Sequence, residues 1–392
     1  MTKKHIANLA FRFVLIIGIV NLFADFTYEG GRSVMGAFLG TLGASGTIVG
    51  FVAGFGELMG YGLRSITGFI GDKTHKYWLM TLFGYFINLF AVPALALAGN
   101  WPTAAALMIL ERTGRAIRKP NIDTMLAYTT KEMGRGWVFG FNEALDQTGA
   151  TIGPLIVALV LYLKGGYRYG FAVLLISAVL CFVTLILARI LYPRPQDLEK
   201  KEAIPLRTKG FSSAYWFSVI AGACIAAGFV DFSLISFHFQ KTHIISSHII
   251  PIYYAVAMAT GAITALLFGK LLDKIGFPSV FIAFFISSLF APFIFLGNSL
   301  FALFGMILWG AGIGAQDSLL KSILVPIIPA NKRSTGFGVF DTSYGIFWFL
   351  GSATIGVLYD KSIPALIFFS VLLQLIALPI FFLAERESKQ KK

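Results

Sequence analysis

Long apolar runs follow one another along the whole chain, with short polar breaks between them. Each run is continuous and does not alternate with a period of two, so the pattern predicts helices and not the strands of a closed barrel. A run of about 20 apolar residues is long enough to cross the hydrocarbon core of a membrane as a helix. Twelve spans are predicted, at about 14–35, 46–70, 77–98, 103–126, 136–163, 168–192, 214–238, 249–270, 277–297, 299–325, 334–358 and 363–384.

One polar stretch interrupts this pattern near the middle of the chain. It runs from Tyr192 to about Ser213 and is rich in proline and charge, which is typical of a linker. The sequence therefore predicts an N-terminal six-helix bundle at 1–192, a cytoplasmic linker at 193–213, and a C-terminal six-helix bundle with a short cytoplasmic tail at 214–392. No cleavable signal peptide is expected, because the first apolar run is long enough to be a span itself.

The two predicted halves share three pairs of related segments in the same order. Duplicated halves in so apolar a chain are typical of transporters whose substrate site lies between the halves. The pairs are Gly68-Phe-Ile-Gly-Asp72-Lys73 with Gly269-Lys-Leu-Leu-Asp273-Lys274, the set Arg135, Phe139, Gly140, Glu143 and Gly153 with Arg333, Phe337, Gly338, Asp341 and Gly351, and Phe23-Ala-Asp25-Phe26 with Phe229-Val-Asp231-Phe232.

Composition and charge strengthen the membrane interpretation. The chain is 57% hydrophobic and only 13% charged, whereas soluble domains average about 25% charged residues. The net charge of +13 could suggest a nucleic-acid partner, but no soluble domain is predicted to carry one. Most lysines and arginines fall in segments that share a side with the termini, which predicts that both termini are cytoplasmic. The opposite loops hold only Lys164, Arg168, Lys241 and Lys361.

Four motifs make the chain resemble the major facilitator superfamily over essentially its whole length. Two of them depart in detail, since His75 and the pair Val157-Ala158 stand where that family usually has glycine. The motifs are Gly68-x-x-x-Asp72-Lys73-x-His75-Lys76 between the second and third spans, Glu111-Arg112-Thr-Gly114-Arg115 in the fourth, Gly140-x8-Gly149-x3-Gly153-Pro154 in the fifth, and the copy Gly269-x-x-x-Asp273-Lys274.

The resemblance implies a secondary transporter that works by alternating access. It implies a conformational latch on the inner side made by Asp72, Lys76 and Asp123, although an ordinary solvated loop charge is the alternative. The motif in the fifth span is similar to one common among exporters, so export is favoured over import, and generic helix packing is the other explanation of its glycines. The segments 111–123 and 140–146 resemble a group of poorly defined prokaryotic permeases, which supplies no substrate.

Ionisable residues inside spans are expensive to bury and usually face the interior of a helix bundle. Asp25 and Asp231 occupy matching positions in the two halves and are the leading candidates for proton coupling or for binding a cationic group, with a structural hydrogen bond as the alternative. Arg112 is expected to pair with Glu111, Glu143 or Asp146. The full set of candidates is Asp25, Glu29, Arg32, Glu57, Glu111, Arg112, Arg115, Glu143, Asp146, Asp231, Gln316 and Asp317.

Other chemistries find little support in the sequence. His238, His243 and His248 invite a metal site, but their spacing of five does not form one helical face and favours a solvated cluster. Cys181 and Cys224 lie inside spans and show neither a disulfide nor a metal pattern. No phosphate-binding Gly-Lys-Ser/Thr loop is present, so ATP-driven pumping and a cofactor are not expected.

The function favoured by the sequence is proton-coupled export of a small organic solute across the inner membrane of a prokaryote. The expected partners are the solute, protons and the lipid bilayer, and a monomer is expected. Proton-coupled import, export of a metal or metal chelate, and a non-transporting membrane sensor with the same fold are the alternatives. No enzymatic activity is expected.

Overall fold

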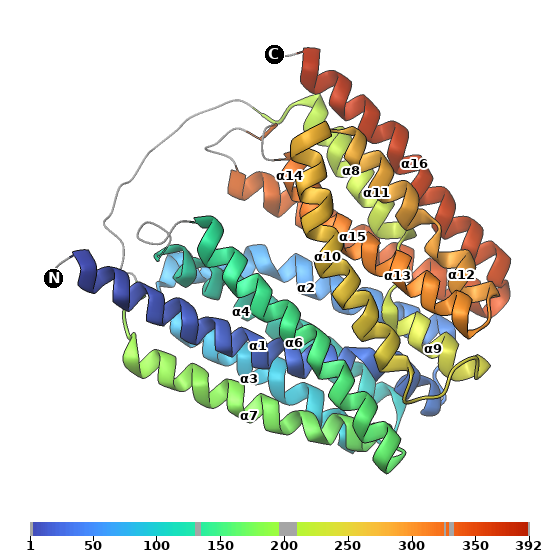
Figure 1. Ribbon diagram of the computed structural model, residues 1–392, viewed down its shortest axis with the longest axis horizontal. Coiled ribbons are helices and arrows are strands. Elements are labelled where there is room, and N and C mark those ends of the chain that lie inside the picture. The colour runs from blue at the N-terminus through green and yellow to red at the C-terminus, as the bar shows by residue number, and fades with distance from the viewer. Residues whose placement is uncertain (1–2, 130–134, 196–209, 325–326, 329–332, 391–392) are drawn as a thin grey trace. The chain divides into compact units, whose positions relative to one another are not determined.

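The computed structural model describes residues 3–129, 135–195, 210–324, 327–328 and 333–390, and the regular elements within them are helices (Figure 1). The first part of the chain forms α1 (Lys3–Thr41), α2 (Gly46–Thr74), α3 (Tyr77–Ala94), the short 3-10 helix η1 (Leu95–Leu97), α4 (Trp101–Ala127), α6 (Arg135–Lys164) and α7 (Tyr167–Leu191). The second part forms α8 (Ser213–Gly228), α9 (Phe232–Thr242), α10 (Ile250–Ile275), α11 (Pro278–Ser288), α12 (Phe290–Leu296), α13 (Ser299–Ala315), the π-helix η3 (Gln316–Leu320), α14 (Lys321–Leu324), α15 (Arg333–Lys361) and α16 (Ile363–Gln390).

Helices long and apolar enough to cross a membrane make up most of the described residues. Ten segments meet both requirements there. Two further helices, α4 with 27 residues and α15 with 29, have the length but a more polar sequence. Together they account for the twelve predicted spans, and the chain is an all-α, multi-pass membrane protein as predicted.

The helices group into two compact units. Unit 1 comprises Met1–Val34 and Gly62–Ile204, and unit 2 comprises Met35–Tyr61 and Pro205–Lys392. Both α1 and α2 are therefore divided between the units. The predicted boundaries at 192 and 213 stay a prediction, and residues 196–209 of the predicted linker lie outside the described residues.

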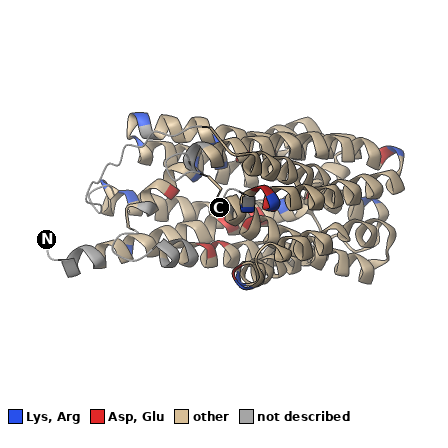
Figure 2. Ribbon diagram, turned by 90° about the horizontal axis from the view of Figure 1, so that it is seen from above, with Lys and Arg blue, Asp and Glu red and all other residues tan. Residues whose placement is uncertain are grey.

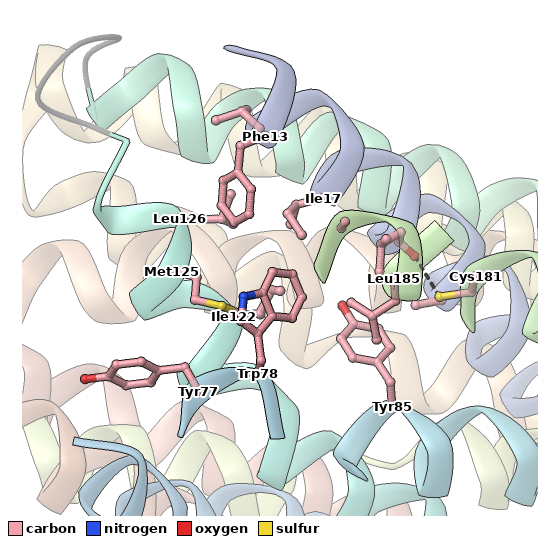
Figure 3. Close-up of a cluster of buried hydrophobic side chains, with 14 of the residues drawn as sticks. Phe13, Ile17, Tyr77, Trp78, Tyr85, Ile122, Met125, Leu126, Cys181 and Leu185 are labelled. Atoms are coloured by element: carbon pink, nitrogen blue, oxygen red, sulfur yellow. Dashed lines mark hydrogen bonds between the residues drawn. The ribbon is translucent and has the colours of Figure 1, made fainter. Parts of the chain in front are cut away.

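The core of unit 1 is an apolar cluster built from α1, α3, α4, α6 and α7 (Figure 3). The rings of Phe13 and Trp78 meet edge to face with centroids 6.4 Å apart, and Phe13 meets Tyr192 at 5.2 Å. The indole N–H of Trp78 donates to the carbonyl oxygen of Tyr192 at 3.0 Å. The buried thiol of Cys181 donates to the carbonyl oxygen of Val20 at 3.1 Å. Aromatic packing and these two bonds hold α1, α3 and α7 in register.

Glycines let pairs of helices touch through their backbones in both units. A Cβ added at Gly153 of α6 would lie 2.3 Å from the carbonyl oxygen of Phe26 in α1. A Cβ added at Gly351 of α15 would lie 2.1 Å from the carbonyl oxygen of Ala227 in α8. The sequence pairs these two glycines in the duplicated halves, and each permits a close helix contact within its own unit.

The predicted span 214–238 is not one helix. It breaks between α8 and α9, where Phe229 and Asp231 have extended backbones. The carbonyl oxygen of Gly228 accepts from the hydroxyl of Ser370 at 2.6 Å, and that of Val230 accepts from the indole N–H of Trp309 at 2.8 Å. A broken helix at membrane depth is tolerated when other protein groups satisfy its backbone in this way.

The start of α2 packs on the end of α15 within unit 2. The carboxylate of Asp360 accepts from the backbone N–H of Gly46 at 3.0 Å and of Thr47 at 2.7 Å, and from the hydroxyl of Thr47 at 2.7 Å. Asp360 lies beyond the predicted span 334–358 and caps α2 from another helix. Partial burial raises its pKa, but the three donated bonds outweigh burial and lower the pKa below its usual value.

Replacing Asp360 tests this cap. Asp360→Ala is expected to lower the unfolding free energy by about 0.5–2 kcal/mol, the usual loss for an N-cap, and Asp360→Asn should lose less because it keeps one acceptor oxygen. Because the folded pKa is depressed, the stabilisation is complete above about pH 4 and disappears as the pH falls through the lowered pKa. Thermal unfolding of the purified protein, followed from about pH 3 to about pH 7, measures both effects. If the difference in stability between the wild type and Asp360→Ala does not shrink at low pH, the cap is contradicted.

Candidate functional site

A network of polar side chains crosses the apolar interior of unit 1. Its members come mainly from α1, α3 and α4, with Asn142 from α6. Figure 2 shows that Lys, Arg, Asp and Glu are sparse along the ribbons of the chain. The network contains residues that are each less than a tenth exposed, namely Asn21, Asp25, Glu29, Asn88, Glu111, Arg112 and Arg118. Each of these polar groups is costly to bury in a membrane-embedded unit, so the network is the candidate functional site.

Asn88 of α3 lies at the centre of this network. Its Nδ2 donates to Oε1 of Glu111 at 2.7 Å, and its Oδ1 accepts from Nε of Arg118 at 3.1 Å. The guanidinium of Arg118 also lies 4.3 Å from the centre of the Tyr85 ring. The neutral amide of Asn88 thus connects an acid and a base that both belong to α4. Both charged side chains keep a hydrogen-bond partner in the interior.

Asp25 occupies a second part of the network, on α1. The hydroxyl of Tyr28, three residues further on, donates to Oδ2 of Asp25 at 3.1 Å. The guanidinium of Arg115 lies 4.6 Å from the centre of the Tyr28 ring, within cation–π distance. Asp25 therefore shares a buried site with a phenol and an arginine from α4.

The remaining predicted charges of α1 and α4 form short contacts. Nη1 of Arg32 lies 3.8 Å from Oε1 of Glu29, and Nε of Arg112 lies 3.4 Å from Oε2 of Glu111. Glu111 is one of the three partners expected for Arg112. Each contact therefore brings a positive and a negative side chain of the same helix together.

The α6 candidates have different surroundings. Glu143 is exposed and accepts from Nε2 of Gln147 at 2.9 Å. Asp146 is half-buried, and its Oδ1 is a buried atom with no hydrogen-bond partner among the described residues. Of the two, Asp146 is the one with a carboxylate oxygen that is buried without a hydrogen bond.

Several members of the network were missed by the sequence analysis. Asn21, Tyr85, Asn88 and Asn142 are neutral, so a search for charges inside spans does not find them. The hydroxyl of Tyr85 donates to Oδ1 of Asn21 at 2.7 Å, and Nδ2 of Asn21 donates to Oδ1 of Asn142 at 3.4 Å. The sequence does carry one signal for them, which is polar side chains on one face of an apolar span. Tyr85 and Asn88 are three residues apart and share one face of α3.

Asp231, which the sequence places at the position matching Asp25, has a local structural role in unit 2. It is the N-cap of α9, and its Oδ1 accepts from the backbone N–H of Ser233 at 2.8 Å. The matching Asp25 lies inside the continuous helix α1 and caps nothing. The two aspartates match in sequence, but the local backbone gives them different tasks.

The cap makes a prediction for Asp231. Asp231→Asn is expected to keep both the stability and the transport of the protein, because asparagine is an equally good N-cap. Asp231→Ala should lower the unfolding free energy by about 0.5–2 kcal/mol. Thermal unfolding and transport assays on both variants measure this, and loss of proton-driven transport in Asp231→Asn would show that the carboxyl does more than cap.

The unit 2 candidates outside α9 gather near a π-helix. The hydroxyl of Tyr344 donates to Oε1 of Gln316, the first residue of η3, and the Tyr61 ring meets that of Tyr344 at 5.4 Å. Glu57 is buried, whereas Asp317 is exposed. π-helical turns are frequent at functional sites, so Gln316 is the better of the two adjacent candidates.

The predicted latch residues are only partly described. The side chain of Asp72 and the surroundings of Gly140 lie outside the described residues. Nζ of Lys119 lies 3.3 Å from Oδ1 of Asp123, an ion pair within α4. The third latch residue, Lys76, is exposed. Among the other residues of the repeated motif, Gly68 faces Pro120 at van der Waals distance, Gly269 faces open space, and Lys73, Asp273 and Lys274 are exposed. Pro154, from the motif of the fifth span, is buried in α6.

The histidines do not assemble a metal site among the described residues. His238 is buried, its Nδ1 lies 3.0 Å from the hydroxyl of Tyr359, and its ring packs on that of Phe295. His243 ends α9 in a left-handed conformation. The predicted solvated cluster is therefore wrong for His238, because α9 turns its ring into the packed interior of unit 2.

Comparisons with known proteins agree with this architecture. The family model described as Major Facilitator Superfamily matches residues 14–352 and 219–392. The uncharacterized protein Rv2265 of Mycobacterium tuberculosis is 36% identical over 379 residues, which are 95% of this chain and 93% of that protein. The multidrug resistance protein MdtG of Proteus mirabilis is 30% identical over 130 residues, which are 33% of this chain and 31% of that protein.

Two solved structures share the fold at low sequence identity. A peptide transporter POT superposes with a TM-score of 0.77 at 15% identity, covering 99% of each chain. A bacterial homologue of the human lysosomal transporter Spinster superposes with a TM-score of 0.75 at 14% identity, covering 98% of each chain. The match of the family model and the mycobacterial relative, together with the twelve-helix architecture, show that the chain belongs to the major facilitator superfamily of membrane transporters.

Proposed function

We propose that this chain is a secondary active transporter that exports a small organic solute in exchange for protons. The observation that carries the proposal is the buried network of charged and neutral polar side chains on α1, α3 and α4. Each buried charge there has a partner of opposite charge or a hydrogen bond. A proton or a group of the solute can replace one of these internal contacts.

Proton coupling is assigned to Asp25, with Asp146 as the second carboxyl. Asp25 is held by the hydroxyl of Tyr28 and lies beside Arg115, so a proton on its carboxyl changes the balance of charge around the arginine. Asp146 offers the buried atom Oδ1, which has no hydrogen-bond partner in the described part of the chain. A buried carboxylate oxygen without a hydrogen bond is costly, and a bound proton or a cationic solute relieves that cost.

A polar solute also has potential contacts in unit 2. The indole N–H of Trp348 is buried and has no acceptor among the described residues. The Trp348 ring packs beside Tyr344 with centroids 5.5 Å apart and beside Phe229 at 5.9 Å. An aromatic wall with one open donor suits a solute with an apolar body and a hydrogen-bond acceptor.

The direction of transport is proposed from the glycines of α6 and from one relative. Gly149 and Gly153 lie against the backbone of α1, at Leu22 and Phe26, and they belong to the motif that resembles exporters. The partial match to a protein named for multidrug resistance supports the same direction. Import by the same alternating-access cycle is the second candidate, and a membrane sensor would lack the flux altogether. Both termini are proposed to lie in the cytoplasm, with the protein in the inner membrane.

The direct test begins with a screen of candidate solutes by thermal shift on the purified protein. The solute that stabilises it most is then assayed in proteoliposomes with a pH gradient imposed in either direction. The proposal expects the solute to accumulate on the more acidic side, against its own gradient. Accumulation on the alkaline side would establish import, and a stabilising solute that is not moved would favour a sensor.

A further inference from the structure

A basic pocket lies in unit 1 at the start of α3, away from the polar network. Its volume is about 410 Å³, and its lining includes His75, Lys76, Trp78, Arg189 and Pro195. None of the described residues that line it is acidic. Two permanent positive charges in a hollow whose described lining holds no carboxylate give an electrostatic field that favours an anion.

The backbone adds to this field. His75 ends α2 in a left-handed conformation with a φ of 53°, and Lys76 precedes α3 without forming a side-chain cap. The first turn of α3 therefore begins in the pocket, with Trp78 among the lining residues. The N-terminus of a helix carries partial positive charge and binds phosphate groups readily.

The rear wall of the pocket is rigid. Trp78 is only 8% exposed, its indole N–H bonds the Tyr192 carbonyl, and its ring packs on Phe13. Figure 3 shows Trp78 within the apolar cluster of unit 1. The pocket thus lies against the core of the unit and is largely preformed, so ligand binding needs little ordering of its side chains.

The position of the pocket identifies the class of ligand. It lies at the ends of three candidate spans, Gly46–Gly71, Tyr77–Leu97 and Tyr167–Leu191. The end of a membrane span lies at the level of the lipid head groups. Large apolar side chains next to it are exposed: Leu79 by 57%, Ile190 by 67% and Leu191 by 61%. A ligand that places an anionic group in the hollow and hydrocarbon along these side chains satisfies both surfaces.

We propose that this pocket binds the phosphate head group of an anionic phospholipid, whose acyl chains lie along the apolar ends of α3 and α7. The phosphate contacts Lys76, Arg189 and the start of α3. The site is separate from the proposed transport path and acts as a lipid anchor at the membrane surface.

The test titrates the purified full-length protein, in a neutral detergent, with phosphatidylglycerol and with phosphatidylcholine, and follows thermal unfolding. Phosphatidylglycerol is expected to raise Tm in a saturable way, and phosphatidylcholine is not. Losing one basic side chain near a lipid surface should weaken apparent binding about fivefold, so Lys76→Gln/Arg189→Gln should need about 25-fold more phosphatidylglycerol. Lys274→Gln, at the exposed end of α10 in unit 2, is the matched control and should bind like the wild type.

Free glycerol phosphate, added at the same concentrations, separates a lipid from a soluble anion. It is expected to leave Tm unchanged, because it lacks the chains that cover the exposed side chains. The proposal is overturned if the phosphatidylglycerol titration is the same in the double variant, if phosphatidylcholine works equally well, or if free glycerol phosphate reproduces the shift. Should the double variant fail to fold, the single variants Lys76→Gln and Arg189→Gln, each about fivefold weaker, carry the same comparison.

Discussion

Asp25→Asn is expected to abolish proton-driven accumulation of solute while solute exchange across the membrane continues. Asparagine keeps the size of the side chain and can still accept from the hydroxyl of Tyr28, but it cannot bind or release a proton. Coupling free energies in proteins are commonly worth about 5- to 150-fold, so accumulation in a pH gradient should fall by about tenfold or more. Exchange between labelled and unlabelled solute, without a gradient, should stay within about twofold.

Asp231→Asn is the matched control for this prediction. It removes the same charge at the matching position of the duplicated half, where the carboxylate caps α9. Both assays are run in proteoliposomes on each variant. Full proton-driven accumulation in Asp25→Asn would contradict the assignment and move the coupling role to Asp146. Loss of exchange as well would mean that Asp25 binds the solute or supports the fold, and solute binding to the purified variant separates those two.

Gly153→Ala is expected to destabilise the protein strongly. The new methyl group would lie 2.3 Å from the carbonyl oxygen of Phe26, so α6 and α1 must move apart. Overpacking of this kind costs about 1–3 kcal/mol. Gly351→Ala should behave in the same way in unit 2, because its methyl group would meet the backbone of Ala227 at 2.1 Å.

Gly269→Ala controls for the general effect of alanine in a helix. A Cβ there meets nothing within 4 Å, and alanine favours a helix over glycine, so the unfolding temperature should stay the same or rise. Thermal unfolding of the three purified variants at one scan rate compares them. Equal unfolding temperatures for Gly153→Ala and Gly269→Ala would show that the close contact between α1 and α6 does not contribute to stability.

Continuous apolar runs predicted the membrane helices well, because burial in lipid leaves few other backbone solutions. The break between α8 and α9 was missed, since it depends on partners from distant helices: Ser370 and Trp309 satisfy the carbonyls of Gly228 and Val230. Gly228 and Asp231 are local signals of a helix end and a helix start, but the distant partners of the carbonyls have no local signal.

The charges inside spans lie on the helices that form the buried polar network, but they do not include the residue at its centre. Asp25 and Glu111 stand out in an apolar sequence, whereas Asn88, which bonds both Glu111 and Arg118, is an ordinary neutral residue until the fold brings α3 beside α4. The matching positions in the duplicated halves also have different surroundings. Asp25 lies in a continuous helix and Asp231 at a helix start, so their carboxylates have different neighbours.

The central claim is that solute movement and proton movement are coupled in this protein. The most direct measurement uses proteoliposomes that contain the wild-type protein and a pH-sensitive dye, with equal pH on both sides and a solute gradient as the only driving force. Flow of solute out of the vesicles is expected to draw protons in, so the interior becomes more acid, and a protonophore should abolish the change. Solute flow that leaves the internal pH unchanged would contradict the account.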